Sequence, residues 1–268
     1  MKTCLNTATT RGYPLSDDLK YCSKYGYEGI EMDTLKLDEY LETRTLEDLK
    51  GEVEGYGLKV AALMAFPFAP FSENTSGLEQ VKKYAGIAAF LNAPVLLAFM
   101  SGKPPETLSA EKAFDMAVET ACRYGDAAGE HNVKVALEPI GRHPFMPGPL
   151  QAMKVIEKSG HPGLGIVVDT FHCYRSEVPI EEIKAIPVER LLVFHINDSE
   201  DKPISELSDS NRLYPGLGIL PLGGYLEVLR DKGYEGFVSV EIFRPEYWQD
   251  KHENIARKAK EALDSLLK

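Results

Sequence analysis

Eight short apolar runs alternate along this chain with longer amphipathic stretches, and this alternation restricts the fold more than any other feature. The runs are nearly continuous in apolar residues, which is typical of parallel strands buried on both faces. Parallel strands joined by helices form either a closed barrel or a doubly wound sheet. The expected strands are residues 3–8, 29–34, 59–66, 94–99, 134–139, 165–170, 191–197 and 237–243.

Eight strand–helix units within 268 residues fit an α/β fold, the (β/α)8 TIM barrel, which commonly forms one domain of about 250 residues. No G-x-G-x-x-G motif follows a strand, which disfavours a dinucleotide-binding sheet. We therefore predict a single TIM barrel domain over residues 1–268. The expected helices are residues 16–26 with Ser16 as N-cap, 43–57, 109–131 opening at Ser109, 221–234 and 251–268.

Four successive strands end in a side chain that can bind a metal. Glu138 ends the fifth expected strand, Asp169 the sixth, His195 the seventh and Glu241 the eighth. Each alone would more often be a capping, ion-pairing or core residue. At the carboxyl ends of neighbouring strands about 4.8 Å apart, however, three carboxylates repel one another unless a cation joins them. We therefore predict one divalent metal site, for Mn²⁺, Zn²⁺, Co²⁺ or Mg²⁺, among which these donors do not choose.

Composition restricts the partners and the compartment. The formal net charge of −11, without a run of lysine or arginine, disfavours nucleic acid and anionic membrane surfaces as partners. The most apolar stretch, residues 85–100, is interrupted by Asn92 and Pro94 and is shorter than the roughly 20 residues of a membrane span. The four cysteines form no C-x-x-C pair, and the first residues lack the apolar segment of a signal peptide. We expect a cytoplasmic protein that could form a homo-oligomer.

Several further residues are candidates for the site. Residues 199–221 show no helix or strand period, and we interpret them as an ordered active-site flap. Within them, Arg212 could bind substrate hydroxyls or steady an intermediate, with a surface ion pair as a nearly equal alternative. His172 follows Asp169 by three residues and is a candidate proton donor or relay. Weaker candidates are Asn6 and His143 for substrate contact, Glu31 for pairing within the barrel, Phe66, Phe68 and Phe71 for an apolar wall or packing, and Trp248 for a cover over the site or an oligomer contact.

Five segments of the chain carry a family resemblance. They are ALEPIG (136–141), VVDTFH (167–172), FHINDSEDKP (194–203), RLYPGLG (212–218) and VSVEIFRPEY (238–247). They resemble the matching segments of the xylose isomerase-like barrel superfamily of sugar isomerases and epimerases, and within it the inosose (2-keto-myo-inositol) isomerase family. The likeness extends from residue 4 to residue 248 and implies one metal held by the four strand-end residues. One departure is Thr7, where the family has a glutamate.

The resemblance implies an isomerase of inositol catabolism that moves the keto group of a polyol ketone to the neighbouring carbon. A metal that holds both oxygens of an α-hydroxyketone stabilises the enediolate through which this reaction proceeds. Glu138 and Glu241 lie on non-adjacent strands and are the acid–base candidates, as the resemblance also implies. No Gly-rich phosphate site follows the last two strands, which favours an unphosphorylated small-molecule polyol or keto-sugar as substrate.

Four alternatives remain open at this stage. A ketose 3-epimerase and a dehydratase of a keto-polyol or dehydroshikimate type would use the same metal site and the same intermediate. A DNA-repair endonuclease on the same barrel would need three metals and more than the six histidines present, and the negative charge opposes it. A sugar-binding protein without activity would not need both glutamates.

Overall fold

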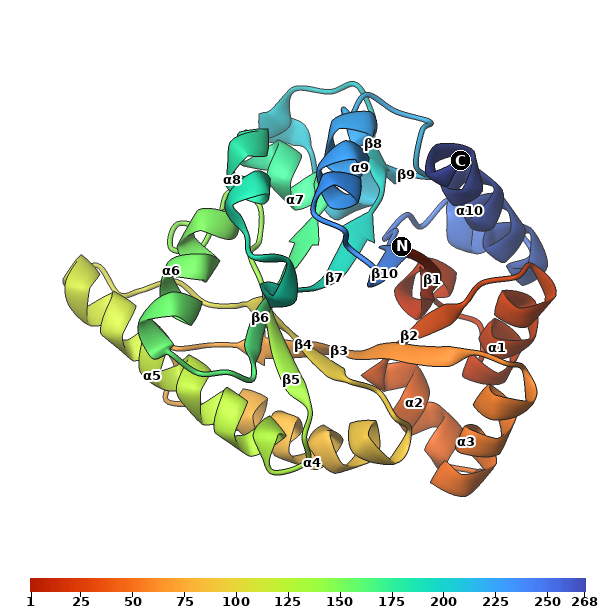
Figure 1. Ribbon diagram of the computed structural model, residues 1–268, viewed down its shortest axis with the longest axis horizontal. Helices are drawn as coiled ribbons and strands as arrows, with labels where there is room; N and C mark the ends of the chain where they lie inside the picture. Colours follow the sequence, from red (N-terminus) through yellow and green to blue (C-terminus); the bar gives the residue numbers. More distant parts are fainter.

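Eight parallel strands close into a barrel in the order β1–β10–β7–β6–β5–β4–β3–β2 (Figure 1). The computed structural model describes residues 1–268. β1 pairs with β2 on one side and with β10 on the other, which closes the sheet and confirms the predicted (β/α)8 barrel. The strands are β1 (Lys2–Asn6), β2 (Gly29–Asp33), β3 (Lys59–Phe68), β4 (Val95–Met100), β5 (Lys134–Glu138), β6 (Leu164–Asp169), β7 (Leu191–Ile196) and β10 (Phe237–Val240).

Helices surround the strands on the outside (Figure 1). The predicted N-cap Ser109 is confirmed, because its side chain accepts a hydrogen bond from the Lys112 N–H. The predicted N-cap Ser16 is wrong, because the Pro14 carbonyl already accepts from the N–H of Asp17 and so starts the helix earlier. The helices are α1 (Leu15–Lys24), α2 (Thr34–Leu41), α3 (Leu46–Gly55), α4 (Ser76–Phe90), α5 (Ala110–Gly129), α6 (Pro149–Ser159), α7 (Thr170–Arg175), α8 (Ile180–Ala185), α9 (Leu222–Asp231) and α10 (His252–Leu267).

β1 ends two residues and β10 three residues earlier than the apolar runs suggested. After β1 the chain turns into a short 3-10 helix, Thr7–Thr10, because the Asn6 side chain accepts from the Ala8 N–H and caps that turn. β10 ends at Val240, so Glu241 is the first residue beyond it. Both changes keep the strand-end side chains at the rim of the barrel.

The interior of the barrel is filled by side chains that alternate along the strands. A small cluster contributed by strands alone comprises Ala62, Met64, Val95, Leu97, Ala136, Val167 and Val193. Side chains two residues apart on a strand point to the same face. Glu138, Asp169 and His195 each lie two residues after a member of this cluster and therefore also point into the barrel. The larger part of the core lies between the strands and the helices.

The segment expected to be an ordered flap, residues 199–221, is ordered and begins as a two-stranded ribbon. β8 (Asp198–Ser199) pairs antiparallel with β9 (Arg212–Leu213). The buried Asp198 carboxylate accepts hydrogen bonds from the backbone N–H groups of Gly216 and Leu220 and so ties the segment together. None of the helices combines the length and the apolar character that crossing a membrane requires.

Candidate metal centre

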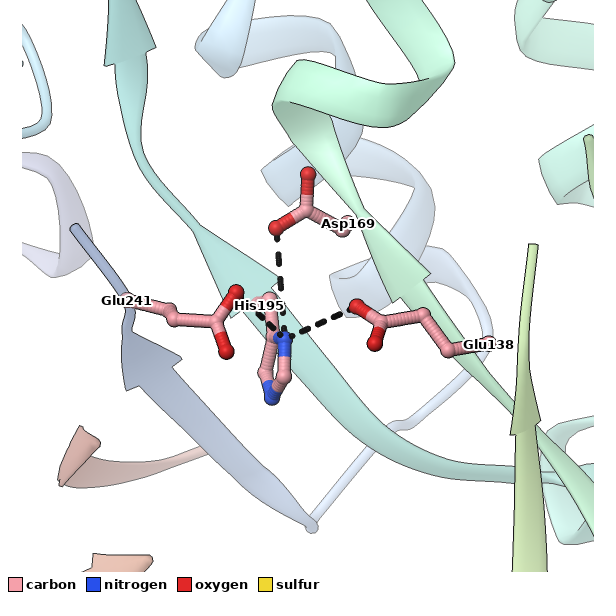
Figure 2. A group of neighbouring side chains, drawn as sticks. All are labelled: Glu138, Asp169, His195 and Glu241. Carbon is pink, nitrogen blue, oxygen red and sulfur yellow. Dashed lines mark ion pairs between the residues drawn. The ribbon is translucent and has the colours of Figure 1, made fainter. Parts of the chain in front are cut away.

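The four strand-end residues expected to bind a metal converge on one point (Figure 2). Glu138, Asp169, His195 and Glu241 each offer one donor atom, and these atoms all lie within 4.8 Å of one another. His195 Nδ1 is 3.3 Å from Glu138 Oε1, 3.3 Å from Glu241 Oε2 and 3.9 Å from Asp169 Oδ2. All four side chains are buried, and the most exposed, Glu138, is only 5% exposed.

Glu31 determines which nitrogen of His195 faces the carboxylates. His195 Nε2 lies 3.1 and 3.0 Å from the two oxygens of the fully buried Glu31, and Ser239 Oγ donates to Glu31 Oε2 at 2.8 Å. A carboxylate only accepts hydrogen bonds, so Nε2 carries the proton. In the neutral ring, which is the form that binds a metal, Nδ1 is then left with a lone pair that points at three acidic side chains. A carboxylate that orients a histidine in this way is a common partner of metal-binding imidazoles.

The residues present fit a divalent cation. Two buried atoms of the group, His195 Nδ1 and Glu138 Oε1, have no hydrogen-bond partner in the protein. Isolated buried polar atoms are costly and rare unless an ion or a water pairs with them. Three carboxylates and one imidazole are donors that suit Zn²⁺, Mn²⁺ or Co²⁺. The group can therefore hold one such ion.

The pKa values in this group are shifted by burial and by neighbouring charged side chains. Burial raises the pKa of Glu138 to about 7. Burial acts against the charged form of Asp169 as well, but the Arg212 guanidinium outweighs it and lowers the pKa of Asp169 to about 2. Burial lowers the pKa of His195, yet the Glu241 and Glu31 carboxylates raise it more, so that its pKa lies above the usual range. A proton and a cation would thus compete for the same place.

Arg212 lies beside the four residues and does not make the surface ion pair that was one expectation. It is only 1% exposed, because the β8–β9 ribbon folds it inward. Nη1 donates to Asp169 Oδ2 at 2.8 Å and to Glu241 Oε2 at 2.9 Å, while Nε and Nη2 donate to Asp209 Oδ1. Nη2 also donates to His172 Nε2 at 3.2 Å. Its donors are therefore occupied, and a substrate contact would require one of these bonds to break.

His172 lies in α7, where it is buried against Arg212. Burial lowers its pKa, although Asp169 opposes that shift. Because Nε2 accepts from Arg212, the neutral ring carries its proton on Nδ1, which is buried and has no protein partner. The side chain lines the same cavity as Glu138 and Glu241. The expected role of His172 as a proton donor or relay stays a prediction.

Asn6 and His143, the weaker candidates for substrate contact, both make hydrogen bonds within the protein. Asn6 is fully buried; its amide donates to Glu241 Oε1 at 3.0 Å and accepts from Ala8, so it positions that glutamate instead of facing the cavity. His143 donates from Nε2 to the Gly102 carbonyl and accepts two backbone N–H groups on Nδ1, so it holds its loop together. Neither residue lines the cavity.

Three of the four aromatic candidates pack against other side chains, and the fourth lines the cavity. Phe66 and Phe68 are buried in the hydrophobic core, and Phe71 packs edge-to-face on Phe145, so these three serve packing. Trp248, by contrast, lines the cavity beside the four converging residues.

The cavity has a volume of about 760 Å³, within the usual range for small-molecule sites. Sequence reasoning missed several of its lining residues. Asp33 ends β2 and Phe99 lies near the end of β4, so the strand-end rule that found the four metal-binding candidates could have found both. Phe243 lies three residues beyond β10. Arg11 follows a 3-10 turn, and no sequence signal indicated it.

Similar proteins are found by sequence and by structure. The family model described as xylose isomerase-like TIM barrel matches residues 19–268. The chain is 34% identical to an inosose isomerase of Halalkalibacterium halodurans, over 97% of this chain and 94% of that protein. It is 32% identical to an inosose isomerase of Bacillus licheniformis, over 97% and 96%. The crystal structure of the IOLI protein with a binding zinc atom superposes with a TM-score of 0.91 at 30% identity, over 100% of this chain and 98% of that chain.

Proposed function

The chain belongs to the xylose isomerase-like TIM barrel family, and from that premise we propose that it is a divalent-metal-dependent inosose isomerase. It would move the keto group of a 2-keto-myo-inositol type polyol ketone to the neighbouring carbon. Relatives bearing the name inosose isomerase align with nearly the whole chain, which supports this substrate class over the epimerase and dehydratase alternatives. A role in inositol catabolism would follow from that substrate.

One observation carries the proposal: three buried carboxylates and an imidazole lone pair meet beside a cavity of small-molecule size. Glu138, Asp169, His195 and Glu241 would hold the ion. When bound, the cation would supply a Lewis acid for the two oxygens of an α-hydroxyketone and would stabilise the negative charge that develops on them. Zinc is the first ion to test, because the related IOLI structure binds it.

Glu138 is the favoured base for removing the proton from the hydroxyl-bearing carbon. Neither of its oxygens accepts a hydrogen bond from the protein, so Oε1 can bind the ion while the second oxygen remains free, whereas both oxygens of Glu241 accept hydrogen bonds, from Asn6 and from Arg212. Burial raises the pKa of Glu138 to about 7 in the metal-free protein, and a bound cation would lower it. Glu241 would then be the candidate for delivering a proton to the neighbouring carbon.

Moving a keto group also requires a proton to pass between two oxygens. The hydroxyl oxygen loses its proton as it becomes the new carbonyl, and the old carbonyl oxygen gains one. The neutral His172 ring, which lines the cavity, is our candidate for this relay. Its Nε2 accepts from Arg212, so that bond would have to open before Nε2 could take the proton from the hydroxyl and return it to the old carbonyl oxygen.

Deuterium exchange tests this proposal directly. Protein loaded separately with Zn²⁺, Mn²⁺, Co²⁺ or Mg²⁺ is incubated with keto-inositols and ketohexoses in D₂O, and both label and product are followed by NMR. We expect label at the carbon next to the keto group and a shifted keto group. Glu138→Gln should lower the exchange rate by about 10²–10⁴-fold. The exposed Glu261→Gln serves as control, and metal content is measured for each variant.

Three results would change the proposal in different ways. Absence of exchange by the wild-type protein with every metal and every ketone would exclude the isomerase. Full exchange in both Glu138→Gln and Glu241→Gln would leave the isomerase intact but remove these glutamates from proton transfer. An epimer in place of a shifted keto group would favour the epimerase alternative.

A further inference from the structure

A second polar group faces the cavity away from the proposed metal ligands. Arg11 follows the 3-10 turn after β1, and its side chain is 48% exposed, so it lies at the mouth. Its guanidinium carbon is 5.4 Å from the ring centroid of Phe243 and 5.3 Å from that of Trp248. Arg212 contacts the same Phe243 ring at 5.3 Å. One aromatic side chain therefore connects the mouth of the cavity with the metal centre.

The polar atoms of this group are not satisfied by the protein. The Arg11 side chain makes no hydrogen bond, and its nearest carboxylate oxygen, Asp33 Oδ2, is 3.9 Å away, beyond hydrogen-bond distance. Asp33 is 8% exposed; its Oδ1 accepts from the Leu35 N–H at 2.8 Å, while Oδ2 accepts no hydrogen bond. Both residues line the cavity. A strong donor and a strong acceptor are thus held a short distance apart, and both remain available to a ligand.

We propose that Arg11 and Asp33 form a hydroxyl-binding subsite that recognises the end of a neutral polyol remote from its keto group. A guanidinium donates to a hydroxyl oxygen while a carboxylate accepts from a hydroxyl proton, so the pair matches adjacent hydroxyl groups of either role. A phosphate or carboxylate at this position would pair with Arg11 but would be repelled by the Asp33 carboxylate, whereas a hydroxyl group can pair with both. The subsite rests on the proposed function, because that function puts the reacting end of the substrate at the four metal ligands.

The proposed subsite predicts which substrate analogues bind poorly. A ketone whose remote hydroxyls are intact pairs with both Arg11 and Asp33. A deoxy analogue that lacks those hydroxyls leaves the buried Asp33 carboxylate without that partner, and buried unpaired polar groups are costly. We therefore expect selection against remote deoxy analogues.

Conservative variants test the subsite. Arg11→Met keeps the apolar stem beside the aromatic rings and removes the donors. Asp33→Asn keeps the side-chain acceptor that caps α2 and removes the charge. Arg44→Met, which breaks an exposed ion pair with Glu52 outside the cavity, is the control. Each variant is measured for KM and kcat, for metal content, and for calorimetric binding of a cyclic polyol that has no keto group.

We expect Arg11→Met and Asp33→Asn to raise KM, and the Kd of the keto-free polyol, by about tenfold each, which is the loss of one charge-assisted hydrogen bond. Metal content should stay unchanged and kcat should change less than threefold. With the remote deoxy analogue as substrate, KM should differ by less than twofold between the wild-type protein and the variants. Turnover by the wild-type protein with unchanged KM and Kd in both variants would overturn the subsite alone. Polyol binding without any turnover would overturn only the isomerase, and absence of both polyol binding and turnover would overturn both.

Discussion

Replacing Glu31 by glutamine should weaken metal binding without touching any proposed ligand. Glu31 is fully buried in β2, and both its oxygens lie within 3.1 Å of His195 Nε2. The carboxylate keeps the proton on Nε2 and increases the electron density at Nδ1, the atom that faces the other three ligands. Glutamine has the same shape but no charge, so the packing is retained while this electrostatic support is lost.

The expected loss is about 10–100-fold in metal affinity, which corresponds to about 1.4–2.7 kcal/mol. The lower end applies if the glutamine carbonyl oxygen still accepts from Nε2. Ser239→Ala provides a matched comparison, because it removes a 2.8 Å hydrogen bond to Glu31 and leaves the charge in place. Its loss of affinity should be smaller than that of Glu31→Gln, because the Glu31 carboxylate keeps its charge and its contact with His195 Nε2.

Competition with a zinc chelator measures the affinities, and denaturant unfolding of each metal-free variant checks that it folds. The same difference should appear as a smaller rise in melting temperature at a fixed zinc concentration, because a ligand stabilises the folded state according to its Kd. If Glu31→Gln unfolds cooperatively and binds zinc within twofold of the wild-type Kd, then Glu31 does not support His195 and the derivation of the tautomer is wrong.

Three further predictions concern pH and folding. The metal-free protein should lose about 3 kcal/mol of unfolding free energy as pH rises from about 4.5 to about 7. Burial raises the folded-state pKa of Glu138 to about 7, above its unfolded value, so ionisation of this side chain destabilises the folded protein. Urea denaturation at several pH values tests this, and flat or rising stability would contradict it. Asp18→Ala should cost about 3–5 kcal/mol, because it leaves the buried Lys36 ammonium, 2.7 Å away, without its carboxylate; a loss below 1 kcal/mol in chemical denaturation would count against this. Gly218→Ala should cost about 1–3 kcal/mol and lower the exchange rate, because a Cβ there would lie 2.1 Å from the Ser199 carbonyl oxygen in the ribbon; unchanged unfolding and exchange would refute it.

The barrel and the four converging side chains at its rim could be predicted from the sequence for one physical reason. Strands buried on both faces are apolar throughout, so a charged side chain stands out where each strand ends. Glu138, Asp169, His195 and Glu241 therefore marked the rim, and strand adjacency placed them together. The apolar pattern could not show that β10 stops at Val240, because the chain beyond it stays buried as well.

The contacts across the barrel and within the β8–β9 ribbon could not be predicted from the sequence. Glu31 and His195 lie on β2 and β7, which are not neighbours in the sheet, so no local pattern indicates that their side chains meet. Arg212 reaches the four side chains at the rim through strands of only two residues each, too short for a periodic signal. Arg11 gains its position from aromatic neighbours far along the chain, which only the folded structure brings to it.

The pairing of β1 with β10, which closes the barrel, would determine when a metal ion can bind to all four side chains. Glu241 follows the strand that completes the ring, and its carboxylate is held by Asn6 from the opposite end of the chain. The other three candidate ligands precede Glu241 in the chain, and all four donors can meet only when β10 has paired with β1. An ion held by all four would therefore be taken up after the barrel has closed. Metal supply, and not only donor chemistry, would then decide which ion is found in the isolated protein.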